Sequence, residues 1–418
     1  MTDLKKKFAS AIAAGALLVN LSTPAFASSY EFVVTGNGSE SDSEVKFEQE
    51  NEVTVNQSNY ADVTNDVKVY ANTGENSAED NTGGDVEIKT GDSDTTVAVS
   101  NTLNSNVAQV DACCAADVTA KISGNGEESD NDIDLELENE VKVNQYNDAD
   151  VKNYVETKSE TGENEAEGNT GGDVTIKTGN ADTTVTVATL ANSNSAWVTG
   201  GDGEGGSVSA IIADNGSDSD NEIELELENE TDLDQSNYAD ILNDVEVRAE
   251  SGENEAEDNT GGEVEIKTGD VTADVTVDNM ANFNWADIDG CGCLEDLLAK
   301  INDNGEESDN EIKAELENEQ DVNQYNDLDC SDEEKDACAE VEVKLDSGEN
   351  EAEDNTQGDG EDPTIKTGDA GADVDVENTG NSNVFGGDHE FEWEMPWGFD
   401  FNLNFSFNLE DLLGALMS

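Results

Sequence analysis

One segment of the chain recurs at a nearly constant spacing, and this repeat limits the possible folds more than any other feature. An Asn-Gly turn followed by an acidic segment begins at Asn37, Asn125, Asn215 and Asn304, which are 88, 90 and 89 residues apart. Gly-Glu-Asn and Ile-Lys-Thr-Gly markers recur in step with it. Markers that share one period indicate a repeat array. We assign the repeats to residues 37–124, 125–214, 215–303 and 304–387, after a lead-in at 28–36.

Apolar and polar residues alternate over long stretches of each repeat. Between Val45 and Val69, the odd positions are Val, Phe, Ala, Asn or Gln, whereas most even positions are charged or carry a hydroxyl. Successive side chains of a strand face opposite sides, so the pattern predicts an all-β fold with one apolar and one charged face. Because strands usually have about five to six residues, we expect the path to bend at the inward-facing Asn and Gln. We also expect these amides to form ladders between coils.

Two all-β architectures fit these repeats. A parallel β-solenoid would wind coils of about 17 to 20 residues, about 4.8 Å apart, around a thin core. A recurring Asn-x-Ala signature has roughly this spacing within the first repeat, so we favour the solenoid. The alternative is four tandem immunoglobulin-like sandwiches, because such domains have about 100 residues. Aromatic residues make up only 5% of the chain, which argues against sandwich cores.

The polar signatures resemble a known family of repeats. They are Gln57-x-Asn59-x-Ala61, Gly74-Glu75-Asn76-Ser77-Ala78 and Gln145-x-Asn147-x-Ala149. This pattern is similar to that of curlin-like, Asn- and Gly-rich repeats of the bacterial cell surface. The resemblance covers roughly residues 37–384 and implies a secreted β-solenoid subunit that forms fibres. The chain departs from that family in its acidity and in its longer repeat.

The N-terminus has the features of a secretory signal. Lys5 to Lys7 form a basic region, residues 8–21 are apolar, and Ala25-Phe26-Ala27 is a small-residue cleavage box. The sequence therefore predicts a signal peptide at residues 1–27 and a secreted product, extracellular or at the cell surface. No later segment approaches the roughly 18 apolar residues of a membrane-spanning helix, so we expect no transmembrane segment after cleavage.

The chain is strongly acidic, with 101 Asp and Glu against 18 Lys and Arg and a net charge of −83. This balance excludes nucleic acid as a partner. Carboxylates stacked 4.8 Å apart would repel each other by about 3.5 kcal/mol at an effective dielectric of about 20. Calcium, which binds oxygen ligands and is plentiful outside cells, is the predicted structural cofactor; a solvated acidic surface is the alternative. The candidate ligands follow the Asn-Gly turns: Glu127, Glu128, Asp130, Asp132, Asp218, Asp220, Glu222, Glu306, Glu307, Asp309 and Glu311.

Six cysteines suit an exported protein with disulfides. Cys330 and Cys338 bracket a seven-residue insertion in the fourth repeat, and we predict that they pair and close this loop. The remaining four lie in one equivalent loop of the first and third repeats, and their pairing is open: Cys113, Cys114, Cys291 and Cys293.

The last 31 residues differ in composition from the repeats. Residues 388–418 are aromatic and alternating, which suits either a cap on the last coil or an attachment element that binds another copy or an envelope component. The candidate attachment residues are Phe391, Trp393, Trp397, Phe399, Phe401, Phe405 and Phe407. Leucines at 409, 412, 413 and 416 have helical spacing, as do Leu294, Leu297, Leu298 and Ile301.

Catalytic residues are scarce. The chain has one His, His389, and one Arg, Arg248, and its paired carboxylates occur everywhere. We therefore expect no enzyme and no catalytic or cofactor-binding residue, with a β-helix polysaccharide lyase using Arg248 as base as a remote alternative. The sequence predicts a secreted structural repeat protein, fibre-forming and stabilised by calcium. The runner-up is a calcium-dependent adhesin of tandem sandwiches.

Overall fold

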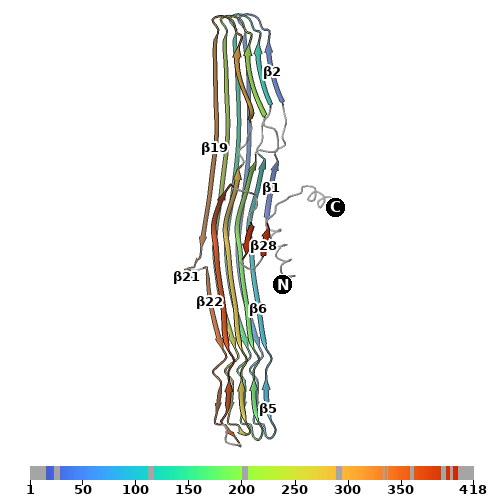
Figure 1. Cartoon of the computed structure of the whole chain (residues 1–418), viewed down its shortest axis with the longest axis vertical. Coiled ribbons are helices and arrows are strands. Elements are labelled where there is room, and N and C mark those ends of the chain that lie inside the picture. The colour runs from blue at the N-terminus through green and yellow to red at the C-terminus, as the bar shows by residue number, and fades with distance from the viewer. Residues whose placement is uncertain are drawn as a thin grey trace, which may run out of the picture.

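The described part of the protein is built from β-strands. The computed structural model describes residues 16–22, 29–111, 117–199, 206–288, 294–332, 335–336, 338–357, 362–386, 392–395 and 399–402. None of these residues forms a helix, so none forms an apolar helix of membrane-spanning length. The molecule is long and narrow, and its longest strands run along its long axis (Figure 1).

The strands form six stacks that follow one another along the coil. The first stack comprises β2 (Ser29–Thr35), β7 (Asp117–Ser123), β12 (Gly206–Ala213) and β18 (Leu294–Asn302). The second stack comprises β3 (Asp42–Asn72), β8 (Asp130–Glu160), β13 (Asp220–Glu250) and β19 (Asp309–Asp329), and β22 (Ala339–Asp346) continues the path of β19 along β13. Two short stacks comprise β4 (Ser77–Glu79), β9 (Glu165–Glu167), β14 (Glu255–Glu257) and β23 (Glu351–Glu353), and then β15 (Thr260–Gly261) and β24 (Thr356–Gln357). The last two comprise β5 (Val86–Lys89), β10 (Val174–Lys177), β16 (Val264–Lys267) and β25 (Thr364–Lys366), and then β6 (Ser93–Asp111), β11 (Ala181–Thr199), β17 (Val271–Ile288) and β26 (Ala370–Phe385).

Three smaller features complete the chain. Strand β1 (Ala16–Ser22) pairs with β6 in parallel. Two antiparallel hairpins consist of β20 (Ser331–Asp332) with β21 (Lys335–Asp336), and of β27 (Glu392–Met395) with β28 (Phe399–Asn402).

The stacked strands are parallel and in register, and the register defines the coil. Ile133 pairs with Ile223, which pairs with Ile312, so neighbours in a stack are one whole repeat apart. The fold is therefore a β-solenoid in which one turn of the chain takes 88 to 90 residues, or 96 to 99 where the turn includes the insertion at 330–338. The expected coil of 17–20 residues is wrong. Tandem immunoglobulin-like sandwiches are also excluded, because the main sheets are formed between repeats rather than within them.

The long strands do not bend at the inward-facing Asn and Gln, contrary to the prediction from the sequence. Strands β3, β8 and β13 each have 31 residues, and Gln57 and Asn59 lie in the middle of β3. A straight path is stable because two layers of long strands, β3 with its stack and β6 with its stack, face each other and bury both inner faces. Val155 of β8 packs in one cluster with Val185 of β11, for example. The inward amides lie between such apolar clusters and act as bridges rather than corners.

Two further expectations concern single segments. Asp240 pairs with Asp329 and Asn243 with Ala339, so the stack resumes in register after the insertion at 330–338. A disulfide joins Cys330 to Cys338, as predicted. The helical spacing at Leu294 to Ile301 was misleading, since this segment is strand β18, which pairs with β12 and so contributes to the stacked sheet.

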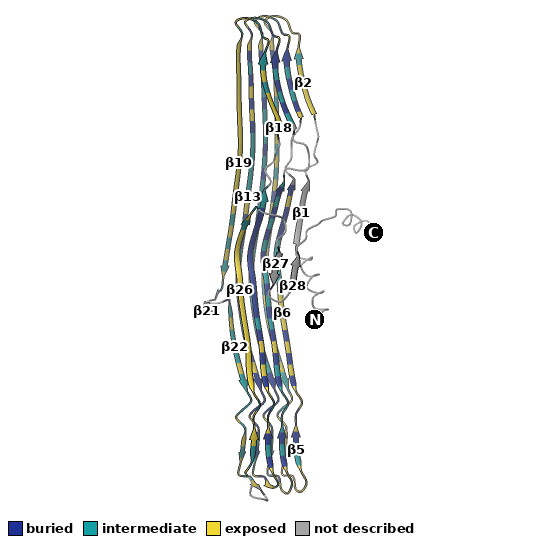
Figure 2. Cartoon of the chain, in the orientation of Figure 1, coloured by how far each residue is buried: buried dark blue, intermediate teal, exposed yellow. Residues whose placement is uncertain are grey.

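We name the two outermost layers of the stack for use below. The N-terminal coil comprises strands β2 to β6, residues 29–111, and the C-terminal coil comprises strands β18 to β26, residues 294–386. Figure 2 shows dark, buried positions alternating along the inner strands, whereas β19 and β26 are exposed over most of their length. Burial therefore differs strongly between the inner coils and the C-terminal coil.

Candidate functional site

A column of asparagine side chains runs through the interior along the stacking direction. The amide Nδ2 of Asn59 donates to Oδ1 of Asn147 at 3.0 Å, Asn147 donates to Asn237 at 2.9 Å, and Asn237 donates to Asn326 at 2.9 Å. Asn147 and Asn237 are fully buried. A buried amide without partners would cost about 1–3 kcal/mol, so the column stabilises only coils that keep this register.

A second column faces the first from the opposite layer. Asn106 donates to Asn194 and Asn194 to Asn284, each at 3.0 Å, and Asn106 also donates across the core to Asn147 at 3.0 Å. The columns bond to each other and to neighbouring coils, so they fix both the stacking and the distance between layers. The predicted amide ladders are thus confirmed.

Tyrosines form a third column, on the outer face. The rings of Tyr60, Tyr146, Tyr238 and Tyr325 follow one another with centroids 5.4, 5.5 and 5.4 Å apart. They do not share one register, because Tyr146 pairs with Ser58 and Tyr60 pairs with Asp148. The ring therefore alternates between two positions from coil to coil.

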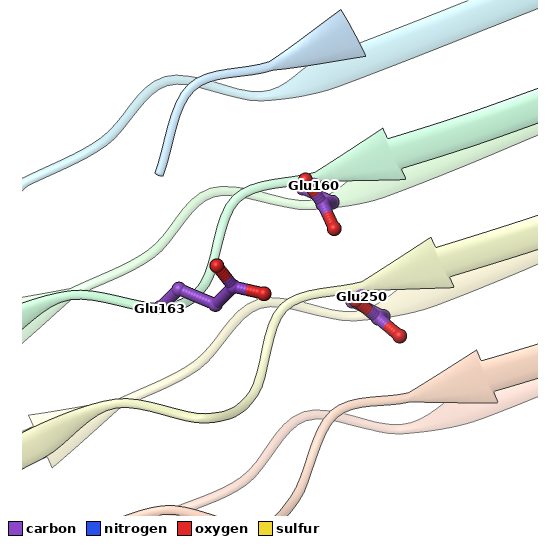
Figure 3. Close-up of side chains that lie close together, drawn as sticks. All are labelled: Glu160, Glu163 and Glu250. Atoms are coloured by element: carbon purple, nitrogen blue, oxygen red, sulfur yellow. The ribbon is translucent and has the colours of Figure 1, made fainter. Parts of the chain in front are cut away.

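Carboxylates gather where the long strands end. Glu160 is the last residue of β8, Glu250 is the last residue of β13, and Glu163 lies on the loop after β8 (Figure 3). One carboxylate oxygen from each lies within 4.8 Å of the others. Oxygen ligands of this kind suit a hard cation such as calcium.

Basic side chains already neutralise the buried members of this cluster. Lys158 forms an ion pair with Glu160, and Arg248 forms one with Glu250. Burial alone would raise the pKa of Glu160, yet the hydrogen bonds from Lys158 and Tyr70 hold that pKa below its ordinary value. A divalent cation bound here would have to displace these cations.

A second cluster of three close carboxylates consists of Glu253, Asp346 and Glu349, with one residue at a strand end, Asp346, and two in the loops that follow the strands. Burial raises the pKa of Glu253, and the carboxylates of Glu250 and Glu163 add to the effect. The second cluster therefore has the greater need of a counter-charge. Neither cluster was predicted, because the expected coil was too short. The 90 residues between Glu160 and Glu250 are one repeat, so the period of the sequence could have placed these two side chains next to each other.

The predicted calcium ligands lie at the opposite end of the long strands. Asp130 pairs with Asp42 and Asp220, so carboxylates do repeat along the stack there. Burial raises the pKa of Asp130, with smaller contributions from Asp220 and Asp42, and burial and Glu222 raise that of Asp132. The remaining predicted ligands lie in or beside the same turns, where Glu128, Asp218 and Glu307 have a left-handed backbone: Glu127, Glu128, Asp218, Asp220, Glu222, Glu306, Glu307, Asp309 and Glu311. Neither group of three close carboxylates found among the described residues includes any of them.

Several other predicted residues have a definite place, and some lie outside the described ranges. Arg248, the remote catalytic candidate, is ion-paired with Glu250. In the tail hairpin Trp393 pairs with Phe401, and Phe399 pairs with Met395. The following lie outside the described residues: Cys113, Cys114, Cys291, Cys293, His389, Phe391, Trp397, Phe405, Phe407 and the leucines at 409–416.

Comparison of the chain with protein-family models, with curated proteins and with solved structures gave no match. We therefore infer the function from the columns and clusters described above.

Proposed function

We propose that the chain is a secreted, non-enzymatic structural protein of the bacterial cell surface or extracellular matrix. The observation that supports this most directly is the set of amide columns. They hold the long parallel strands of neighbouring coils in one register and stiffen the molecule. A rigid, repetitive, acidic scaffold suits a mechanical role. The adhesin of tandem sandwiches loses its basis because the repeats share their sheets.

Calcium belongs to this proposal as a structural partner. Aligned carboxylates recur along the stack, for example Glu228, whose pKa is raised by burial and then by Glu138 and Glu317. Lysines offset some of the charge, as Lys366 does for Glu265 at 2.6 Å. Because the chain has 18 basic residues against 101 acidic ones, the charge of most carboxylates must be balanced by mobile or bound cations. Attachment to the envelope or to another copy through residues 388–418 also belongs to this proposal.

Cell fractionation tests the proposed location. The full chain, expressed in a bacterium with its own leader, should lose its first 27 residues and become accessible to protease added to intact cells. A matched chain without residues 1–27 should stay inside the cell and be protected. If the full chain is protected as well and keeps its leader, the proposed role outside the cell is wrong.

A further inference from the structure

The core of the solenoid is open at the C-terminal coil. Ile312 and Leu316 are 47% and 61% exposed, whereas Ile223 and Leu227, which pair with them on the inner coil, are 0% and 4% exposed. The N-terminal coil differs, since Val45 is only 5% exposed. Each coil is therefore covered by the coil that follows it in sequence, and the C-terminal coil has no such cover among the described residues.

Glycines show how closely a following coil must approach. A Cβ added to Gly252 would lie 1.9 Å from the carbonyl oxygen of Gly348, and one added to Gly74 would lie 1.9 Å from that of Gly162. At Gly348 the same Cβ would meet only Asp346 Oδ1, at 3.6 Å. Glycine is thus kept at position 348 although nothing described in the chain requires it.

The N-terminal coil has the complementary feature. A Cβ added to Gly216 would lie 2.5 Å from the backbone nitrogen of Glu127, and one added to Gly126 would lie 2.4 Å from that of Ser39. At Gly38, the equivalent position of the first coil, no atom lies within 4 Å. Each end of the stack therefore has a glycine, Gly348 or Gly38, that would allow the backbone of one more coil to approach closely.

The amide column gives the two ends opposite hydrogen-bonding character. In each of the three steps of the column from Asn59 to Asn326, the amide nitrogen donates to the next coil in sequence, as Asn237 does to Asn326. Asn326 donates only within its own coil, to Ser382 and Asn383, among the described residues. Asn59, at the other end, accepts no hydrogen bond from a described residue. A coil placed after Asn326 can continue the column only if it offers an acceptor, as Asn59 does.

The outer face has the same continuity. Tyr325 occupies the ring position that Tyr146 occupies two coils earlier, and Tyr60 occupies the position of Tyr238. An N-terminal coil placed on the C-terminal coil would bring Tyr60 next to Tyr325 in the same alternation. Two N-terminal coils placed face to face would instead repeat one position.

We infer that a second copy of this chain docks head to tail, with its N-terminal coil on the open C-terminal coil, at Gly348 and Asn326 of one copy and Gly38 and Asn59 of the next. This inference rests on the proposed structural role and adds the partner and the polarity of assembly.

Opposite charges meet at one position of the junction and like charges are avoided at another. Following the register, Glu342 of one copy would face Lys68 of the next, and Asp375 would face the uncharged Ala98. In the other half Glu315 would face Glu48. Assembly should therefore depend on cations that screen this half.

Strand β1 occupies part of the same surface. Its residues Ala16 to Ser22 pair with Ser105 to Asp111 on the open edge of β6, where the docking copy would place β26. These residues belong to the predicted signal peptide. Assembly should therefore follow removal of the leader, and the precursor should remain monomeric.

Glycine variants test the inference on the full chain, carrying a specific protease site after Ala27 so that the leader is removed after folding. The mass of the assemblies is measured by light scattering in millimolar calcium, before and after cleavage. The cleaved parent chain should form long assemblies. Gly38→Ala and Gly348→Ala should each keep the parent's circular dichroism and melt at or above the melting temperature of the parent monomer, but stay monomeric, because each blocks one end. Their mixture should give about twofold the monomer mass and no more, since only one pair of ends can dock.

Gly371→Ala is the matched control, because a Cβ there meets nothing within 4 Å and the equivalent positions of the inner coils already carry side chains, such as Thr272. It should assemble like the parent. A dimer of either single variant alone would overturn the head-to-tail polarity. A cleaved parent that stays monomeric would overturn the docking itself and indicate that residues 388–418 cover the C-terminal coil. Neither result bears on where cells send the protein, so failure here is distinguishable from failure of the proposed role.

Discussion

Gly216 gives the sharpest test of the stacking within one chain. It lies in the Asn-Gly turn of an inner coil, and a Cβ at this position would meet the nitrogen of Glu127 at 2.5 Å and the carbonyl carbon and oxygen of Gly126 at 2.5 and 2.6 Å. These atoms are backbone and cannot rotate away. The Gly216→Ala change must therefore push two coils apart.

The magnitude follows from the contacts. Overpacking in a close-packed region costs about 1–3 kcal/mol. The hydrogen bond from the nitrogen of Gly216 to the carbonyl oxygen of Asn125, 2.9 Å long, would be strained or lost at about 1 kcal/mol. Replacing glycine reduces the conformational entropy of the unfolded chain, which stabilises the folded state by about 0.4–1 kcal/mol. We expect a net loss of about 1–4 kcal/mol in the free energy of unfolding.

Gly38→Ala is the control, in the same column and the same turn. Because no atom lies within 4 Å of the added Cβ, this change should be neutral or stabilise the chain by up to about 1 kcal/mol. Urea unfolding followed by circular dichroism, on monomeric protein, compares the two midpoints. Equal midpoints for the two variants would refute the close stacking of the coils.

Three further predictions concern the core, the acidic groups and calcium. Asn147→Ala removes a fully buried member of the amide column and should lower the free energy of unfolding by about 2–4 kcal/mol. The control is Asn144→Ala, on the outer face of the same strand, which should change this free energy by less than about 0.5 kcal/mol. Similar urea midpoints for the two variants would argue against a stabilising role of the column. Burial raises the pKa of Asp278 above its ordinary 3.8, so the native state holds this proton more tightly than the unfolded state, and stability should fall as pH rises from 3.8 through the raised value. Asp278→Asn should therefore raise the melting temperature at neutral pH and not below pH 3.8, and a lower melting temperature at neutral pH would contradict this. Millimolar calcium should raise the melting temperature more than sodium does at equal ionic strength. This rise should be smaller in the double variant Glu253→Gln, Glu349→Gln. Equal effects of the two salts on the parent chain would show that calcium does not stabilise the fold.

The sequence predicted the class of fold but not the size of the coil. The alternation from Val45 to Val69 correctly indicated strands with one inward face, and the amides of Asn59 and Asn147 correctly indicated ladders. The usual strand length then suggested bends that do not exist. Strand length is set by what the strand packs against, and here a facing layer of equal regularity lets β3 run for 31 residues.

The carboxylate clusters were not predicted for the same reason, because the expected coil was too short. Once the coil is the whole repeat, positions one period apart become neighbours, and Glu160 meets Glu250. In a solenoid with coils of about 17–20 residues, these two side chains would lie several coils apart. The pairing of Cys330 with Cys338 did not depend on the coil, because a short loop needs only local geometry, and it was predicted correctly.

The size of the coil is the central claim, and one disulfide tests it directly. Asn144 pairs with Asp234 in neighbouring strands, and paired residues of adjacent strands lie close enough for a disulfide. A chain with Asn144→Cys and Asp234→Cys should form a disulfide between these positions within one molecule, seen by peptide mass mapping, without loss of folded structure. Free thiols at both positions in a folded, oxidised monomer would contradict the account.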